Sequence, residues 1–289
     1  MRPVVQFLLI VLLAAPSSQT GWAQSAPTGL DPGKALTQHM HTVWNDDDGL
    51  PHSTVNAVAQ TPDGYLWVGT DGGVVRFNGA AFDVYDRSNT EAFADGHTVR
   101  TLLVDENGQL WIGTTGAGLV QYADGRFTEV GTPAALDRAQ GSALHEDPDG
   151  TLWVGTFEDG LFQVQDGRAR LVDRVPTNTL ITALHADPSG TLWVGTAEGL
   201  YRLDKDGPPR VVGPDDGLPG PFVVALGHGA DGHLWVSTRD GLARLVDGAV
   251  QPPRPAALAS VSAFAFWTSE SGSLWIGTDG RGLMRVRDG

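Results

Sequence analysis

The chain has 289 residues, a formal net charge of −15 at pH 7, 41% hydrophobic residues and no cysteine. The missing cysteine excludes disulfide scaffolds, thiolate metal sites, cysteine nucleophiles and thiol redox switches. The acidic balance argues against a nucleic acid or an anionic membrane as partner, and the hydrophobic content is too high for a disordered protein. A chain of this length can bury the core of one large β domain or of two ordinary domains.

The first 23 residues have the pattern of a secretory signal peptide. Arg2 provides a short positive region, a 12-residue apolar region runs from Val4 to Ala15, and Gly21-Trp22-Ala23 fits a small-x-small cleavage site. Because about 20 apolar residues are needed to span a bilayer, we expect cleavage after Ala23 and a periplasmic or secreted protein. An uncleaved anchor in the inner membrane is the alternative. Residues 24–37 are interpreted as a linker.

A pentapeptide of the type Leu-Trp-Val/Ile-Gly/Ser-Thr recurs six times in the rest of the chain. The intervals between its tryptophans are 44, 42, 40, 42 and 40 residues. This is the period of a four-stranded propeller blade. The six tryptophans are Trp67, Trp111, Trp153, Trp193, Trp235 and Trp275.

Each copy contains the parts of such a blade in the same order. In the first copy an apolar strand over residues 55–59 precedes the turn Pro62-Asp63-Gly64, where glycine permits a tight hairpin. The Trp strand follows, rich in the β-branched and aromatic residues that strands favour. A third strand and a short outer strand over residues 82–85 complete the copy. No later segment has a convincing amphipathic helical pattern, so the prediction is an all-β fold.

The sequence also indicates how the ring closes. The sixth copy ends at Gly289, where its outer strand should begin, and the segment from Gln38 to Trp44 has the character of an outer strand. We therefore predict a propeller of four-stranded antiparallel blades over residues 38–289. It has six blades, and an N-terminal strand completes the last one, which leaves no exposed sheet edge. An incomplete seven-bladed ring is the alternative.

Four motifs of the first copy characterise the repeat. They are Asp-Gly-Leu-Pro at 48–51, Val-Asn-Ala-Val at 55–58, Asp-Gly-Tyr-Leu-Trp-Val-Gly-Thr at 63–70 and Gly-Gly-Val-Val-Arg-Phe-Asn-Gly at 72–79. Together they resemble the two-component regulator propeller family, over nearly the whole chain after the leader. In that family the repeats form periplasmic sensor propellers, followed by a β-sandwich module, a transmembrane helix and a cytoplasmic histidine kinase or diguanylate cyclase.

The resemblance implies an exported sensor that binds a small-molecule ligand, with oligosaccharides and peptides as candidates. Because the sequence ends after six repeats, we expect it to lack its own output domain and to signal through a membrane sensor kinase or cyclase. A protein–protein interaction scaffold is one alternative. A propeller enzyme resembling streptogramin lyases is another, although the turn after the Trp strand, Asp71-Gly72-Gly73 in the first copy, departs from the lyase pattern. We expect no enzymatic activity and no cofactor.

The residue eleven positions before each tryptophan is the first candidate for a binding role. It is polar in four copies, where it is predicted to rim the mouth of the central channel: Asn56, Arg100, Ser142 and Thr182. Arg100 is the strongest candidate, since a guanidinium binds a carboxylate through two hydrogen bonds. An ion pair at the surface or between blades is its alternative role.

The turns that follow the Trp strands provide the other candidates. They open on the face of a propeller where ligands bind, and they differ between copies, which is how a repeat fold acquires a site. Solvated loops are the alternative interpretation. The candidates in these turns are Asp71, Glu158, Asp159, Glu198, Arg239 and Arg281.

Two further patterns are interpreted as structural. His145 and His185 each stand eight residues before a tryptophan, and we expect them on different walls of the ring, too far apart to share a metal. Asp46-Asp47-Asp48 lacks the alternating oxygen ligands of a calcium loop and is predicted to be a solvated turn. The sequence contains no nucleophile elbow, phosphate-binding loop or His-Glu-x-x-His motif, so no metal or catalytic site is predicted.

Overall fold

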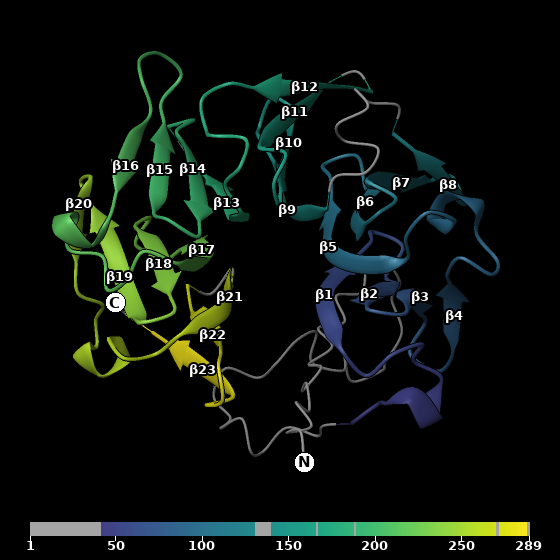
Figure 1. Cartoon of the computed structure of the whole chain (residues 1–289). Helices are drawn as coiled ribbons and strands as arrows, with labels where there is room; N and C mark the ends of the chain where they lie inside the picture. Colours follow the sequence, from purple (N-terminus) through teal and green to yellow (C-terminus); the bar gives the residue numbers. More distant parts are fainter. Residues whose placement is uncertain (1–41, 131–139, 166, 188, 270–271, 288–289) are drawn as a thin grey trace, which may run out of the picture.

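The strands assemble into six antiparallel sheets placed like blades around a central axis (Figure 1). This computed structural model describes residues 42–130, 140–165, 167–187, 189–269 and 272–287. Successive sheets follow one another around the ring in chain order. Within a sheet each strand pairs with the next one along the chain. The predicted all-β fold and its six blades are confirmed.

Each sheet is a meander that runs from the axis to the rim. The first contains β1 (Val55–Gln60), β2 (Leu66–Thr70), β3 (Gly73–Phe77) and β4 (Phe82–Tyr85). The second contains β5 (Thr98–Val104), β6 (Leu110–Thr115), β7 (Leu119–Ala123) and β8 (Arg126–Glu129). The third contains β9 (Gly141–Glu146), β10 (Leu152–Thr156), β11 (Leu161–Gln165) and β12 (Arg168–Val172). The fourth contains β13 (Ile181–Ala186), β14 (Leu192–Thr196), β15 (Leu200–Leu203) and β16 (Arg210–Val212). The fifth contains β17 (Val223–His228), β18 (Leu234–Thr238), β19 (Gly241–Val246) and β20 (Ala249–Gln251). In the sixth, β21 (Ala263–Thr268), β22 (Leu274–Thr278) and β23 (Leu283–Val286) are described.

In the first five sheets the tryptophan of the second strand packs toward the following blade. Trp67 is fully buried beside Leu110 and Ile112 of the second sheet, and its ring centroid lies 4.6 Å from that of Tyr122. Trp193 is buried in the same way against β17 and β18. An aromatic side chain of this size buries roughly 150–250 Å². The repeated tryptophan therefore forms the core between blades as well as the core within one.

The glycine two residues after the tryptophan allows the next blade to come close. A Cβ atom placed on Gly155 would lie 2.4 Å from Ile181 Cγ2, and one on Gly195 would lie 2.6 Å from Val223 Cγ1. Both β-branched residues stand at the start of the next blade's first strand, and both are fully buried. A larger residue at the glycine would push neighbouring first strands apart.

The threonine that ends the Trp strand shapes the turn after it. Thr156 Oγ1 donates to the carbonyl oxygen of Gly160 at 2.8 Å and accepts the backbone N–H of Asp159 at 3.0 Å. The same pair of bonds forms at Thr196 with Gly199 and Glu198. Both hydroxyls are buried, so these turns are held from inside the sheet. Variable turn residues are thereby presented on a constant frame.

The repeated Asp-Gly-Leu-Pro segments form the same link into a first strand. Each follows a short 3₁₀ helix, η2 (Asp46–Asp48) in one case and η4 (Pro214–Asp216) in the other. Gly49 and Gly217 have φ angles of 104° and 101°, which glycine adopts readily. The leucines that follow are buried. Two more 3₁₀ helices, η3 (Glu91–Phe93) and η5 (Ala256–Leu258), occupy the links before β5 and β21.

The segment expected to close the ring is only partly described. The leader, the linker and the expected strand up to residue 41 lie outside the described residues. Residues 42–44 form no strand, and Trp44 packs on the first blade, 5.2 Å from Phe77 and 6.5 Å from Phe82 between ring centroids. Neighbouring first strands pack side by side from β1 to β21, yet in the described part of the chain β21 and β1 lack such packing.

We predict that replacing Gly155 by Ala lowers the free energy of unfolding by about 1–3 kcal/mol, the usual cost of an overpacked core. The matched control is Gly277→Ala in the sixth blade. There, among the described residues, the nearest atom to an added Cβ is Ala265 Cβ at 3.8 Å, so we expect a change within about 0.5 kcal/mol. Chemical denaturation of both variants measures the difference, and equal costs would contradict the proposed role of the glycine.

Candidate functional site

A pocket of about 380 Å³ opens where the first strands of four blades begin. Side chains at one strand position face the axis together because neighbouring first strands lie side by side. The pocket therefore contains all four residues predicted to rim the channel, together with residues of the adjoining links and turns. Its lining is Asn56, Arg100, Gln140, Ser142, Phe157, Leu180, Ile181 and Thr182. We call it the channel-mouth pocket.

Three of the four predicted residues also join one blade to the next. Asn56 Nδ2 donates to the carbonyl oxygen of Val99 at 2.8 Å, and Thr182 Oγ1 donates to that of Val223 at 2.7 Å. Ser142 Oγ donates in the same way to the carbonyl oxygen of Ile181. These bonds form a polar belt between neighbouring first strands. The hydroxyl and amide donors of these residues are consequently engaged within the protein.

Arg100 stands at the same position of the second blade but does not join the belt. Its Nε donates to Thr115 Oγ1 at 3.3 Å, and its Nη1 lies 3.7 Å from Asp71 Oδ1. Both contacts are long, and 47% of the side chain is exposed. An exposed ion pair at this distance contributes little to stability. Arg100 is thus a cation loosely held at the pocket mouth.

The other predicted turn residues are placed unevenly around this pocket. Asp71 lies just behind its wall, where its carboxylate accepts a 2.8 Å hydrogen bond from Asn56. The remaining five are not among the lining residues, and four of them are exposed while Asp159 is half-buried. The guanidinium of Arg239 lies 3.7 Å from the ring centroid of Phe222, so it is stacked on its own blade. These five are Glu158, Asp159, Glu198, Arg239 and Arg281.

Sequence reasoning missed the apolar part of this lining. Phe157, which follows Thr156 in the third blade, is 43% exposed beside the mouth, and Leu180 and Ile181 form the inner wall. Phe157 stands where other copies have Asp71, Ala197 or Arg239. Its large apolar side chain in an exposed turn was the signal that could have identified it.

The expectation that His145 and His185 lie far apart is wrong. Their ring centroids are 5.4 Å apart, and that of His228 lies 4.4 Å from His185. Nε2 of His185 and Nδ1 of His228 form a hydrogen bond, and the backbone N–H of Ala186 donates to His145 Nε2 at 2.9 Å. The rings meet because adjacent first strands are in contact near the axis.

This histidine cluster (His145, His185 and His228) is held in its uncharged form. Burial, together with the neighbouring His228 and His145, lowers the pKa of His185 to about 3 against the opposing charge of Asp187. Burial also lowers the pKa of His145 and of His228, against the opposing charges of Asp147 for the former and of Asp187 and Asp231 for the latter. Among the described residues, no group of three or more His, Cys, Asp or Glu side chains is arranged so that it could hold a metal ion.

The Asp46–Asp48 segment is exposed and forms η2, whose N-terminus is capped by Asn45. Asp48 Oδ2 accepts the backbone N–H of Asn45 at 2.9 Å, and Asn45 Oδ1 accepts that of Asp47 at 2.7 Å. The carboxylate of Asp48 is thus engaged within the link itself. The interpretation as a solvated turn agrees with this geometry.

Comparison with known proteins confirms the resemblance inferred from the motifs. Residues 49–72, 94–116 and 141–158 match the family model described as two component regulator propeller. The fold is similar to the extracellular domain of a putative hybrid two component system protein from B. thetaiotaomicron, with a TM-score of 0.72 and 21% identity over 86% of this chain and 35% of that one. A second such domain from that organism gives a TM-score of 0.59 and 20% identity over 82% and 33% of the two chains.

A virginiamycin B lyase from Staphylococcus aureus is also similar, with a TM-score of 0.63 and 16% identity over 81% of each chain. At these identities the likenesses show the fold. The chain spans 35% and 33% of the lengths of the two extracellular domains. No sequence among the curated proteins matches the chain. Within the described residues, no helix has the length and apolar character needed to cross a bilayer.

The histidine cluster predicts that stability falls on acidification. A histidine whose pKa is lowered in the folded state contributes stability above its unfolded pKa of about 6.5, and this contribution is lost as the pH falls. For His185 alone we expect a loss of about 2 kcal/mol between pH 7 and pH 5. Denaturation at both pH values measures it.

The matched variant is His185→Leu, because leucine stands at the corresponding position of the second blade, Leu103. It should be less sensitive to pH over this range than the unmodified chain. An unchanged difference between pH 7 and pH 5 would show that the cluster is not responsible.

Proposed function

We propose that this chain, which carries repeats of the two-component regulator propeller family, is an exported sensor propeller that binds an anionic small molecule in its channel-mouth pocket. The observation that carries the proposal is the position of Arg100, half exposed at the mouth and held only by long contacts to Thr115 and Asp71. Of the four polar residues that share its strand position, it is the one outside the hydrogen-bonded belt.

The size and lining of the pocket support binding of a small molecule. Its volume of about 380 Å³ lies within the range of ligand pockets, which are mostly apolar with a few convergent polar groups. Phe157, Leu180 and Ile181 supply the apolar surface. The Arg100 guanidinium supplies a fork that matches a carboxylate. An acidic oligosaccharide or a peptide carries both a carboxylate and surface for the apolar wall.

Binding accounts for this lining better than catalysis does. A general base or nucleophile needs a side chain free to accept or attack. The side-chain donors of Asn56, Ser142 and Thr182 are committed to backbone carbonyl oxygens. The guanidinium of Arg100 offers hydrogen-bond donors and no acceptor. The pocket thus offers recognition of charge and shape.

The belt also provides a route from ligand binding to a partner. The pocket is lined by the first strands of successive blades, so an occupant bridges them and restricts their relative motion. The partner would be a membrane sensor kinase or cyclase, as the family plan suggests. The signal peptide over residues 1–23 supports export, and the similar solved structures are extracellular domains of two-component system proteins.

We predict that a cognate ligand raises the melting temperature of the chain from residue 24 onward, and that Arg100→Ala abolishes the rise. A ligand at about 100 times its dissociation constant adds about 2.7 kcal/mol, which corresponds to roughly 5–10 °C for a domain of this size. Acidic oligosaccharides, peptides and organic acids are the panel for a thermal-shift screen.

The matched control is Arg126→Ala, which removes an exposed arginine on the rim strand β8. Arg126→Ala should bind the same ligand and show the same rise in melting temperature as the unmodified chain. If no compound shifts the unmodified chain while a protein partner still binds it, the scaffold alternative replaces this proposal. A ligand shift that survives Arg100→Ala would mean that the anion is bound elsewhere.

A further inference from the structure

Four of the six blades place a guanidinium group over the face of their repeated tryptophan. In these blades the arginine stands on the third strand, directly opposite the tryptophan in the β ladder. The distances from the guanidinium carbon to the indole centroid are 5.8, 5.6, 5.7 and 5.3 Å. Such a geometry is a cation–π contact. The pairs are Arg76–Trp67, Arg202–Trp193, Arg244–Trp235 and Arg285–Trp275.

A carboxylate completes the arrangement in two of these blades. Arg76 donates to Asp63 at 2.9 Å, and Arg244 donates to Asp231 at 3.0 Å. Both aspartates stand in the turn between the first and second strands, four residues before the tryptophan. In the fourth blade the charge of Arg202 is balanced by Asp204, whose carboxylate lies 3.0 Å from it. The repeat therefore contains a position built for a cation between an indole face and an acidic turn.

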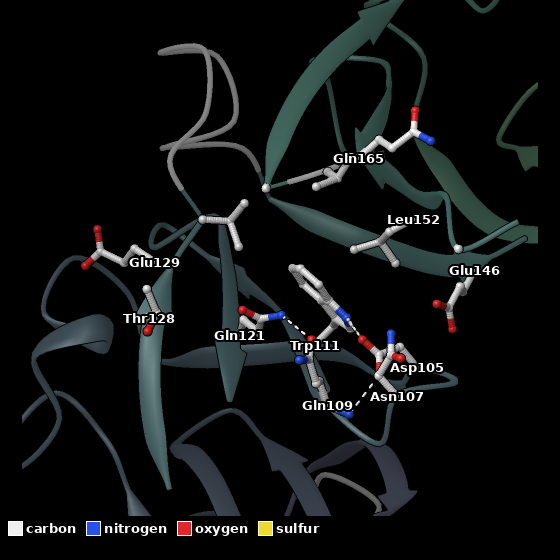
Figure 2. Close-up of a pocket in the computed structure, with 14 residues that line it drawn as sticks. Asp105, Asn107, Gln109, Trp111, Gln121, Thr128, Glu129, Glu146, Leu152 and Gln165 are labelled. Atoms are coloured by element: carbon white, nitrogen blue, oxygen red, sulfur yellow. Dashed lines mark hydrogen bonds between the residues drawn. The ribbon is translucent and has the colours of Figure 1, made fainter. Parts of the chain in front are cut away.

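The second and third blades keep the tryptophan but lack the arginine, and in the third Gln163 stands opposite Trp153. The second blade also lacks the aspartate of the turn. Gln121 stands opposite Trp111 in the ladder, and Asn107 occupies the turn position of Asp63 and Asp231. The Gln121 amide donates to Gln109 Oε1 at 2.7 Å, as Figure 2 shows. Glutamine is shorter than arginine and uncharged, so among the described residues no guanidinium stands opposite the indole of Trp111.

A cavity of about 470 Å³ lies at this place, between the second and third blades (Figure 2). Trp111 and Gln121 line it on one side, and Glu146 and Leu152 line it on the other. Its lining includes the turns around Asn107 and Gly150, which lie at the opposite end of the strands from the channel-mouth pocket. The two sites are therefore on different faces of the propeller. We call this one the Trp111 cavity.

The Trp111 cavity is acidic. Asp105, Glu129 and Glu146 line it, and none of its described lining residues is basic. Asp105 accepts hydrogen bonds from Trp111 Nε1 at 2.9 Å and from the backbone N–H of Gln109 at 2.8 Å, which orients the indole. Glu146 accepts the backbone N–H of Glu106 at 2.8 Å. Burial raises the pKa of Glu146, and the charges of Asp105 and Glu106 raise it further. A bound cation would relieve this repulsion.

We propose that the Trp111 cavity binds a guanidinium group supplied from outside the chain. The indole face of Trp111 and the carboxylates beside it take the place that Trp235 and Asp231 provide for Arg244 in the fifth blade. Guanidinium is planar, so it stacks on an indole and still donates to carboxylates at its edge. The group is carried either by a free small molecule or by an arginine side chain of a peptide. This site is independent of the one proposed for anions at Arg100.

The first test uses two probes of equal shape and different charge. Butylguanidinium should shift the NMR resonance of the Trp111 indole N–H, with a dissociation constant in the millimolar range expected of so small a fragment. Butylurea lacks the charge and should bind at least about tenfold more weakly, the loss of a cation–π contact of about 1.4 kcal/mol. Binding should also weaken as the pH falls and Glu146 becomes protonated. Equal binding of the two probes, or no shift at tens of millimolar butylguanidinium, would overturn the proposal.

The second test places an arginine of the chain itself in the cavity by substituting Gln121. Gln121→Arg restores the residue that four other blades carry, so it should fold and should abolish binding of butylguanidinium. Gln121→Ala removes the same side chain without supplying a cation and should retain binding within about threefold. Arg100→Ala should have no effect, which separates this site from the channel-mouth pocket. Undiminished binding to Gln121→Arg would show that the probe sits elsewhere.

The source of the guanidinium is distinguished by a peptide pair. Blocked Gly-Arg-Gly and blocked Gly-citrulline-Gly differ only in the exchange of guanidinium for urea. An arginine peptide that binds at least about tenfold more tightly than butylguanidinium points to a peptide, and weaker binding points to a free small molecule. In both cases the citrulline peptide should bind at least about tenfold more weakly than its arginine counterpart. Equal binding of the two peptides would contradict recognition of the guanidinium.

Discussion

The close approach of neighbouring first strands is the constraint on which the rest of this propeller depends. It is possible because in the first, third and fourth blades the glycine of the Trp strand leaves room for a β-branched residue of the next blade, as Gly155 does for Ile181. Interiors are packed densely enough that one added methyl group there is felt. The tryptophan two residues earlier then covers the outer part of the same interface. The repeated pentapeptide thus determines both how closely neighbouring blades approach and how the interface between them is packed.

The distance between neighbouring first strands determines which side chains meet near the axis. At the start of the first strands it brings polar side chains within reach of the next blade's carbonyl oxygens, so that Asn56, Ser142 and Thr182 form a belt. Near the other end it brings His145, His185 and His228 into contact, although each comes from a different blade. Arg100 is the residue that the belt leaves loosely held, and the proposed anion site follows from that exception.

The repeat also makes departures from it informative. A tryptophan opposite a glutamine, as at Trp111 and Trp153, is informative because the four other blades have an arginine at that position. That arginine stacks on the indole and is balanced by a carboxylate in three of the four. Trp111 keeps the indole and acidic surroundings without the cation. The same reasoning applies to Gly277, whose neighbouring space in the described structure lacks the tight contact seen at Gly155. In both cases the other copies serve as internal controls.

The sequence by itself determined the blades, since a meander is made of hairpins whose contacts are local and whose turns require glycine. The period of the tryptophans, the strand boundaries such as Phe82–Tyr85 and the channel-facing position of Arg100 all follow from this local pattern. Contacts between blades join residues about 40 positions apart, and their distances depend on how the blades are placed around the axis. Only the tertiary structure therefore decided that three histidines meet, that Phe157 lines the channel-mouth pocket and that a cavity lies beside Trp111.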